Sequence, residues 1–196
     1  MVKEVFFVRH GQSEFNAWRA RQLFSPSQWL VKDPMIRDAV LTRKGQEQAV
    51  EQRVAAAGIG PVQLLVSSPL TRAVQTMRLM FPEVTCPVLL TPLCREKLNY
   101  ACDIGLPTSK LKVMYPDYTF LHFEEEHWWK HRPNAPFDVC KETTDEVKQR
   151  IAAFRDFLQA REETKIVVVA HGYFIQMALD HLLMPGNCQI RRVELP

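Results

Sequence analysis

The sequence predicts an α/β protein, a three-layer α/β/α sandwich around a mostly parallel sheet, with an irregular insertion after the third strand. Short apolar runs without period-two alternation predict strands that are covered on both faces, as in parallel sheets. Most of these runs are followed by residues with the apolar spacing of a helix, and such connections bring parallel strands side by side through right-handed crossovers. We treat residues 1–196 as one domain, because this length suffices for one large core.

Three strands are expected in the first half of the chain, over residues 5–8, 62–66 and 87–91. Residues 13–23 follow the first strand and are expected to form a short helix. Residues 24–39 are rich in Pro, Trp and Asp, a composition that is typical of a loop. We expect this loop to pass over the edge of the sheet.

Two longer helices are predicted from their caps and their apolar stripes. Thr42 is expected to cap the first, and Gly58 to end it in the left-handed conformation. Its predicted buried positions are Ala49, Val50, Val54 and Ala57. Ser68 is expected to cap the second helix, with Pro69 in its first turn. The stripe of this second helix contains Leu70, Ala73, Val74, Met77 and Phe81.

The second half begins with residues 92–141, where prolines interrupt every regular pattern. We interpret this stretch as an insertion that shapes the substrate pocket and contains one short helix over residues 109–115. A capping box at residues 143–146 then opens a long helix. The remaining expected elements are a strand over 166–170, a helix over 173–183 and an edge strand over 189–195.

Composition narrows the class of protein. Hydrophobic residues make up 46% of the chain and charged residues 24%, which are ordinary values for a soluble globular protein. The net charge of +3 is small and the basic residues are dispersed, so we expect no nucleic-acid partner. The five cysteines form no Cys-x-x-Cys pair and no secretory segment is recognised, so reduced thiols and a cytoplasmic location are expected. No apolar run is long enough to span a bilayer, so we expect no membrane partner.

Polar side chains of matched chemistry stand where the predicted strands end. They are Arg9, His10, Arg72, Glu96 and His171. In an open parallel sheet, ligands bind beyond the carboxyl ends of the strands, so these five side chains are predicted to form one site. The alternative is coincidence, in which solvated arginines and core histidines merely occupy strand ends.

Two imidazoles, two guanidiniums and one carboxylic acid suit phosphoryl transfer. The guanidiniums neutralise the phosphoryl oxygens, one histidine attacks phosphorus, and the acid protonates the leaving oxygen. Two histidines also suit a metal, but neighbouring cations disfavour a divalent ion, so we expect neither a metal nor another cofactor. A Ser-His-Asp hydrolase is disfavoured, since the sequence contains no Gly-x-Ser-x-Gly elbow.

Three blocks of sequence resemble the histidine phosphatase superfamily, also called phosphoglycerate mutase-like. They are Arg9-His10-Gly11-Gln12-Ser13-Glu14-Phe15-Asn16, Ser67-Ser68-Pro69-Leu70-Thr71-Arg72-Ala73-Val74-Gln75-Thr76 and Val169-Ala170-His171-Gly172. The resemblance implies that His10 is the phosphorylated nucleophile and Glu96 the proton donor. It also implies a set of phosphate-binding residues, namely Arg9, Asn16, Gln22, Arg72 and His171.

The chain departs from the mutases of this superfamily. Glu96 is followed by Lys97, Leu98 and Asn99 where mutases have an Arg, an aromatic residue and a Gly, and the paired arginines that hold a substrate carboxylate in mutases are missing from the insertion. No long tail follows Pro196 to exclude water. We therefore expect a phosphatase acting on a small phosphorylated substrate. The alternatives are a cofactor-dependent phosphoglycerate mutase and a non-catalytic regulatory module.

Two interpretations of the role remain open for each of three further residues. Trp128 and Trp129 either wall the substrate pocket or pack in the interior, and packing is the more frequent use of paired aromatics. Arg95 either steers an anionic leaving group or is a solvent-exposed neighbour of the acid. The oligomeric state is not predicted by any pattern in the chain.

Overall fold

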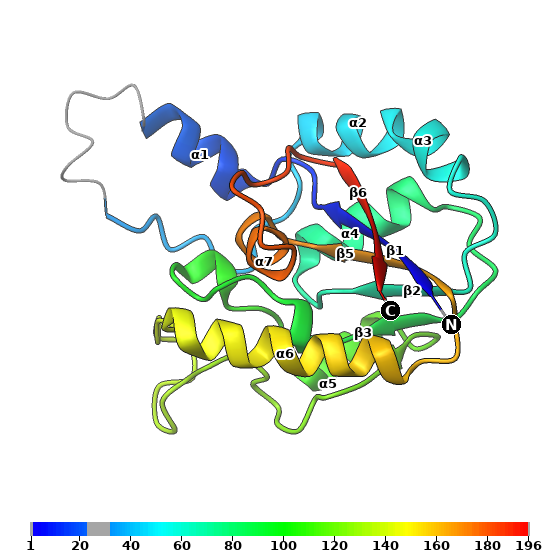
Figure 1. Cartoon of the computed structure of the whole chain (residues 1–196). Helices are drawn as coiled ribbons and strands as arrows, with labels where there is room; N and C mark the ends of the chain where they lie inside the picture. Colours follow the sequence, from blue (N-terminus) through cyan, green and yellow to red (C-terminus); the bar gives the residue numbers. More distant parts are fainter. Residues whose placement is uncertain (1, 23–31, 196) are drawn as a thin grey trace.

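The computed structural model describes residues 2–22 and 32–195, which contain one sheet of six strands (Figure 1). The strands are β1 (Lys3–Arg9), β2 (Leu64–Ser67), β3 (Val88–Leu90), β4 (Thr119–Phe120), β5 (Lys165–Ala170) and β6 (Ile190–Leu195). They lie in the order β4-β3-β2-β5-β1-β6, and only the β1–β6 pair is antiparallel among the described strands. The mostly parallel sheet and the late edge strand are therefore confirmed. Two-residue β4 is an addition, because so short a strand leaves no apolar pattern.

The helices of the described residues follow the predicted order with shifted ends. They are α1 (Glu14–Gln22), α2 (Arg43–Glu51), α3 (Arg53–Ala57), α4 (Thr71–Met80), α5 (Thr108–Met114), α6 (Thr144–Ala160) and α7 (Gly172–Ala178), with two short 3-10 helices, η2 (Pro92–Cys94) and η3 (Ala101–Asp103). Residues 32–39 form a loop, as predicted. The last predicted residue of the first helix, residue 23, and the first part of the predicted loop, residues 24–31, lie outside the described residues. None of the described helices has both the length and the apolar character that a membrane crossing requires.

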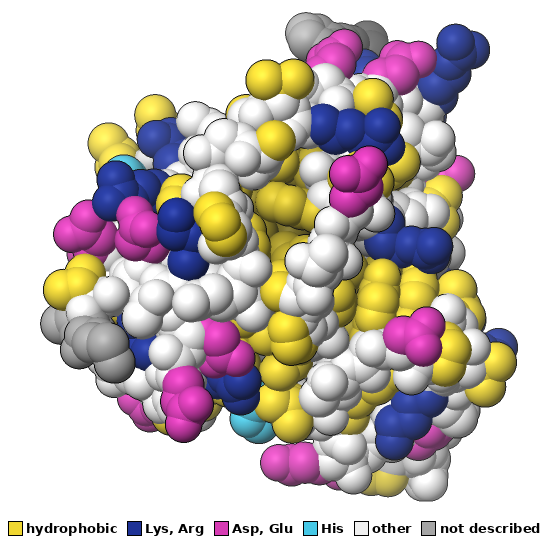
Figure 2. Space-filling model, turned by 90° about the vertical axis from the view of Figure 1, so that its right-hand side faces the viewer, with side chains coloured by type: hydrophobic (Ala, Val, Ile, Leu, Met, Phe, Trp, Pro, Cys, Tyr) yellow, Lys and Arg dark blue, Asp and Glu magenta, His cyan; other side chains and the backbone are white. Residues whose placement is uncertain are grey.

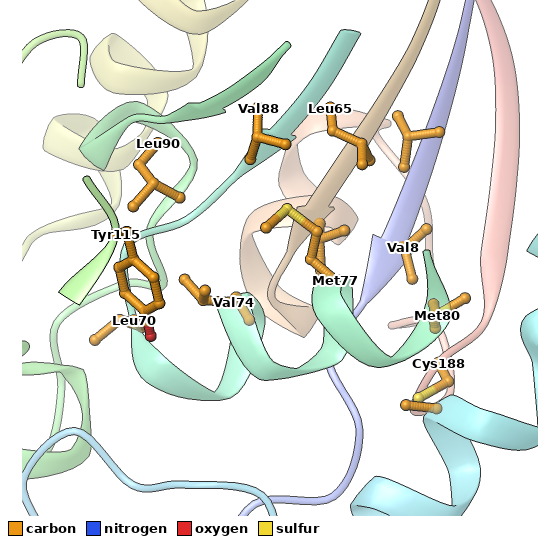
Figure 3. Packing of buried hydrophobic residues seen from close by; sticks show 14 of the residues in the cluster. Val8, Leu65, Leu70, Val74, Met77, Met80, Val88, Leu90, Tyr115 and Cys188 are labelled. Carbon is orange, nitrogen blue, oxygen red and sulfur yellow. The ribbon is translucent and has the colours of Figure 1, made fainter. Parts of the chain in front are cut away.

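Alternate residues of β1 face two separate cores, one on each side of the sheet. Phe7 packs with Phe154 of α6, their ring centroids 6.5 Å apart, in a cluster that also includes residues of α7. Val8 belongs to the opposite cluster, together with Val74 and Met77 of α4 (Figure 3). Burial stabilises each large apolar side chain by roughly 1.5–3 kcal/mol. Helices therefore cover both faces, and the three-layer sandwich is confirmed.

The predicted helix after Thr42 is correct at its start and wrong at its end. Thr42 Oγ1 accepts the N–H of Gly45 at 3.0 Å, as a cap should. Gly58 keeps a right-handed φ of −64°, and Gly60, with φ +79°, makes the left-handed turn into β2. The predicted buried positions Val50, Val54 and Ala57 are exposed, Val54 at 83%. The buried face instead runs through Gly45, Ala49 and Ala56, on both sides of the break at position 52 that separates α2 from α3, so the predicted stripe was placed on the wrong face.

Two other helix ends differ from prediction. Helix α4 begins at Thr71, so Ser68 is not its cap and Pro69 lies outside its first turn. Helix α7 ends at Ala178 and does not reach residue 183, because Asp180 takes a left-handed φ of 50°. The capping box that opens α6 is confirmed by the reciprocal bonds between Thr143 and Glu146.

The two tryptophans of the insertion belong to the core cluster on one face of the sheet. Trp128 and Trp129 are 8% and 2% exposed, and their indole N–H groups donate to the carbonyls of Leu106 and Pro136. A Cβ on Gly105 would lie 2.2 Å from Trp128, so this position needs glycine. The interior interpretation of the two tryptophans is confirmed, and the short predicted helix corresponds to α5.

The amino ends of the parallel strands carry an apolar hollow (Figure 2). A pocket of about 530 Å³ at this end is lined mainly by apolar residues such as Val62, Met80 and Phe81. Arg53 and Glu83 supply its only charges among the lining residues. The predicted chemistry lies at the opposite edge of the sheet.

Candidate active site

A smaller pocket of about 260 Å³ lies beyond the carboxyl ends of β1, β2, β3 and β5. Five of the predicted site residues line it: Arg9, His10, Asn16, Arg72 and Glu96. The other lining residues are Ser13, Phe15, Arg19, Lys97, Asn99, Tyr100, Cys102, Asp103, Gly172, Tyr173 and Met184. Residues from distant parts of the chain therefore meet at one sheet edge, as parallel topology requires.

His10 follows the last residue of β1 and is 3% exposed. Its Nδ1 lies 2.6 Å from the carbonyl oxygen of Gly11, which only accepts hydrogen bonds, so Nδ1 carries the proton and Nε2 keeps its lone pair. Burial lowers the pKa of His10 well below its ordinary value, and the positive charges of Arg72 and Arg9 lower it further. The imidazole is therefore neutral at pH 7 and able to act as a nucleophile.

His171 lies next to His10 but does not form part of the pocket lining. The two rings have centroids 5.1 Å apart, and His171 is fully buried. Its Nε2 is 2.7 Å from the hydroxyl of Ser68, while its Nδ1 has no partner within the described part of the chain. Burial lowers the pKa of His171 as well, with Arg72 adding to the effect. Ser68, predicted as a helix cap, instead orients this histidine.

Arg9 ends β1 and reaches the pocket beside His10. One terminal N–H donates to the carbonyl of Pro185 at 2.8 Å, and its buried Nε has no partner in residues 2–22 and 32–195. A Cβ on Gly172 would lie 3.1 Å from this Nε, so glycine allows the guanidinium to approach the start of α7. The free Nε–H is available to an anion.

Arg72 stands in the first turn of α4 and forms a buried ion pair with Asp103, whose nearest atoms are 2.9 Å apart. A second N–H donates to the carbonyl of Cys102 at 2.6 Å. Asp103 Oδ2 also accepts the backbone N–H groups of Asn99 and Tyr100. The ion pair thus links the start of α4 to the loop that follows Glu96.

The carboxylate of Glu96 points toward the start of α7. It accepts backbone N–H groups of Tyr173 and Phe174 at 3.2 and 3.1 Å, and that of Lys97 at 3.0 Å. Burial nevertheless raises the pKa of Glu96 above its ordinary value, and the nearby charge of Asp103 adds to this shift. A carboxyl group with a raised pKa holds its proton more readily, which suits a proton donor.

A second cluster of charged residues, which does not line the pocket, contacts the main chain around Glu96. Glu142 pairs with Arg95 at 2.5 Å and with Arg150 of α6 at 3.1 Å. Arg150 donates to the carbonyls of Leu93, Arg95 and Glu96. The interpretation of Arg95 as a solvent-exposed neighbour is wrong, because its side chain is only 14% exposed and pairs with Glu142. Arg95 also does not line the pocket in which it would steer a leaving group.

The remaining predicted contacts lie on α1. Asn16 lines the pocket, and its side-chain oxygen accepts the N–H of Ser13 at 3.2 Å. Gln22 is the last residue of α1 and is absent from the pocket lining. Among the described residues, no three His, Cys, Asp or Glu side chains are grouped closely enough to hold a metal ion.

Sequence reasoning gave no binding role to Arg19, Lys97, Tyr100 or Asp103. The sequence pattern gives little indication that these residues belong to the site, since each is a polar residue on a helix or loop with no motif around it. Only the closeness of α1 to the 96–103 loop identifies them as neighbours of the site.

The fold and pocket define an α/β protein whose sheet edge carries a pocket lined by a buried histidine and by two arginines, one at the end of β1 and one in the first turn of α4. A family model described as histidine phosphatase superfamily (branch 1) matches residues 5–196. The chain belongs to this superfamily, whose members similar to it carry the names of phosphatases and phosphoglycerate mutases.

Two curated relatives illustrate the range of names. A "Probable phosphoglycerate mutase GpmB" of Enterobacter sp. (strain 638) is 29% identical, with 97% of this chain and 84% of that protein covered. A "Probable phosphatase" of Schizosaccharomyces pombe is 26% identical, with 89% and 76% covered. Among solved structures, a mycobacterial glucosyl-3-phosphoglycerate phosphatase shares the fold, with TM-score 0.60, 21% identity, and 97% and 92% of the two chains covered.

Proposed function

We propose that the protein is a metal-independent phosphomonoester hydrolase that works through a phosphohistidine on His10. The observation that carries this proposal is the state of His10, a neutral imidazole whose Nδ1–H is bound to Gly11 and whose Nε2 is free. This proposal is supported by the pocket lining, because His10 shares it with Arg9 and Arg72, and guanidiniums suit the non-bridging oxygens of a phosphoryl group.

The reaction has two steps. His10 Nε2 attacks phosphorus and forms the N–P bond while the ester P–O bond breaks, and protonated Glu96 gives its proton to the departing oxygen. Water then attacks the phosphohistidine, Glu96 takes a proton from it, and inorganic phosphate leaves with His10 restored. Arg9, Arg72 and Asn16 bind the phosphoryl oxygens in both steps.

His171 is given the role of a hydrogen-bond donor to the phosphoryl group. Ser68 Oγ–H donates to Nε2 in this scheme, which leaves the proton on the unpartnered Nδ1. Gln22 is the least supported of the proposed contacts, since it lies outside the pocket lining.

The test is to trap the intermediate. Rapid alkaline quenching during turnover of p-nitrophenyl phosphate, followed by mass spectrometry, should find phosphate on His10. His10→Asn should abolish the label and turnover. His122→Asn is the matched control, because His122 lies outside the pocket and its φ of 63° tolerates asparagine. Phosphate on His171 or on a serine would overturn the assignment.

Phosphoglycerate mutase is the second candidate, and the 29% identical relative named as such favours it. With 3-phosphoglycerate and a bisphosphorylated primer, a phosphatase should release phosphate and form little 2-phosphoglycerate. Efficient isomerisation would establish the mutase in place of the hydrolase. A regulatory module would show neither reaction.

A further inference from the structure

A stripe of apolar side chains on α2 and α3 is exposed, although its spacing predicts a core contact. Val50 and Val54 are 41% and 83% exposed, and Ala57 is exposed as well. They lie on a different face of these helices from Ala49 and Ala56, which are buried in the core. An exposed apolar stripe marks a site of protein–protein contact when it continues into a larger apolar surface.

This stripe continues into the apolar hollow at the amino ends of the strands. Ala57 belongs to the stripe and also lines the hollow, whose volume is about 530 Å³ (Figure 2). Val62 and Phe81 line it too, and they are only partly buried although they pack against the core. Val84, from the loop before β3, is 37% exposed. The surface therefore combines a projecting side chain, Val54, with an apolar recess beside it.

Two opposite charges line the hollow. Arg53 belongs to α3 and Glu83 to the loop between α4 and β3. Arg53 Nε donates to the carbonyl of Leu79 at 2.7 Å, but neither charged side chain forms an ion pair within residues 2–22 and 32–195. A partner with charges of one sign would leave one of the two unpaired. A second copy of the same surface offers a carboxylate to Arg53 and a guanidinium to Glu83.

We propose that the stripe and the hollow form the contact between two copies of this chain, related by a twofold axis. Val54 of each copy enters the hollow of the other, and Arg53 of each copy pairs with Glu83 of the other. The apolar contact supplies most of the affinity, and the two ion pairs fix the orientation. The active-site pocket lies at the opposite ends of the strands, so both pockets stay open and the inference does not depend on the proposed hydrolase activity.

The first test measures the mass of the protein in solution. Sedimentation velocity between about 1 and 100 μM should show a species of twice the 22.7 kDa of one chain as the concentration rises. Val54→Asp would bury a carboxylate in the contact and should raise the Kd of the dimer by about 10²-fold or more. Val113→Asp is the matched control, because Val113 is 81% exposed on α5 and does not line the hollow. It should leave the Kd unchanged.

The second test exchanges the two charges. Arg53→Glu and Glu83→Arg should each raise the Kd by about tenfold or more, because each places like charges opposite each other at two positions of the contact. An equimolar mixture of the two variants should recover the dimer, since the two carboxylates of one chain then face the two guanidiniums of the other. A folding defect cannot produce this recovery, because mixing does not repair a misfolded chain.

Three results would contradict the proposal. A wild-type chain that stays monomeric at about 100 μM would refute it, and uptake of the apolar probe anilinonaphthalene sulfonate by that monomer would assign the hollow to a small ligand instead. A dimer whose Kd is the same after Val54→Asp would place the contact elsewhere on the surface. Failure of the mixed charge variants to recover the dimer would overturn the twofold pairing of Arg53 with Glu83.

Discussion

Two buried ion-pair clusters flank Glu96, and they use their arginines differently. In the cluster that lines the pocket, Arg72 donates one bond to Asp103 and one to the carbonyl of Cys102. In the cluster behind the loop, Arg150 uses Nε and both terminal nitrogens on Glu142 and three backbone carbonyls. A guanidinium has five N–H donors, so Arg72 retains donors for a ligand while Arg150 is largely satisfied by the protein.

The difference shows that a buried charged cluster is not by itself a binding site. Both Arg72 and Arg150 have nearly inaccessible side chains, at 4% and 6% exposure, so burial does not separate them. What separates them is the number of donors left free and a position on the pocket wall. We therefore expect the pocket cluster to affect the reaction and the cluster behind it to affect stability.

The largest effect is expected at Glu96, which lines the pocket together with Arg72 and Asp103 and whose carbonyl accepts a hydrogen bond from Arg150. Glu96→Gln should slow hydrolysis of alkyl phosphates by about 10²- to 10⁴-fold, because an alkoxide leaves poorly without a proton. Nitrophenyl phosphate should lose less, since its phenolate leaves without protonation. The measurement is the ratio of variant to wild-type kcat/KM for both substrates. Equal losses would mean that Glu96 positions the substrate without donating a proton.

The next prediction exchanges each arginine for lysine. Arg72→Lys should lower kcat/KM by about 10²- to 10³-fold with a small change in stability, because lysine keeps the charge but loses the planar fork. Arg150→Lys should lower the free energy of unfolding by about 3 kcal/mol, because Glu142 and the carbonyls lose buried partners. Urea unfolding and steady-state kinetics of both variants test this contrast. If Arg150→Lys lost activity and Arg72→Lys lost stability, the binding role would belong to the Arg150 cluster and the prediction would be wrong.

The last prediction concerns pH, and its effect is small within any one pH unit. The two site histidines have folded-state pKa values below the unfolded value near 6.5, so the unfolded chain binds more protons and stability falls as pH drops below about 6.5. Each histidine contributes about 1.4 kcal/mol per pH unit until its folded-state pKa is reached. Burial tends to raise the pKa of Glu142, but Arg150 and Arg95 lower it overall, so this cluster should lose stability only near pH 4 and below.

Urea unfolding between pH 7 and 5 measures this dependence. His10→Asn removes one of the two titrating groups and should reduce the slope by about half. If His10→Asn left the slope of the unfolding free energy against pH unchanged, the loss of stability between pH 7 and 5 would not come from the site histidines.

Local patterns in the sequence were sufficient for the alternating elements and for most of the site. The buried runs predict β1, β2, β3 and β5, and parallel topology then brings Arg9, His10, Arg72 and Glu96 to one edge. The caps at Thr42 and Thr143 are also correct, because a cap depends on atoms only three residues away. Asp38 accepts hydrogen bonds from the backbone N–H and the hydroxyl of Thr71, at the start of α4.

Predictions failed where a residue's role depends on a distant partner. Ser68 precedes a proline at the predicted start of a helix, as a cap does, yet its hydroxyl is hydrogen-bonded to His171, 103 positions away. Arg95 and Arg150 lie 47 and 8 residues from Glu142, and nothing in the local pattern indicates that these three charges share one buried site. Val54 matched a helical stripe but is exposed, because the face of α2 and α3 that packs on the core is the one with Ala49 and Ala56.

The sequence by itself therefore determined which residues form strands and helices and which reactive side chains end the strands, since hydrophobic period and capping act over a few residues. Only the tertiary structure decided which cations remain free, which are consumed by carboxylates, and which aromatic residues pack inside. These outcomes depend on contacts made after the crossovers bring distant segments together. Within the described residues, those contacts pair Arg72 with Asp103 and leave Arg9, Arg19 and Lys97 on the pocket wall without a carboxylate partner.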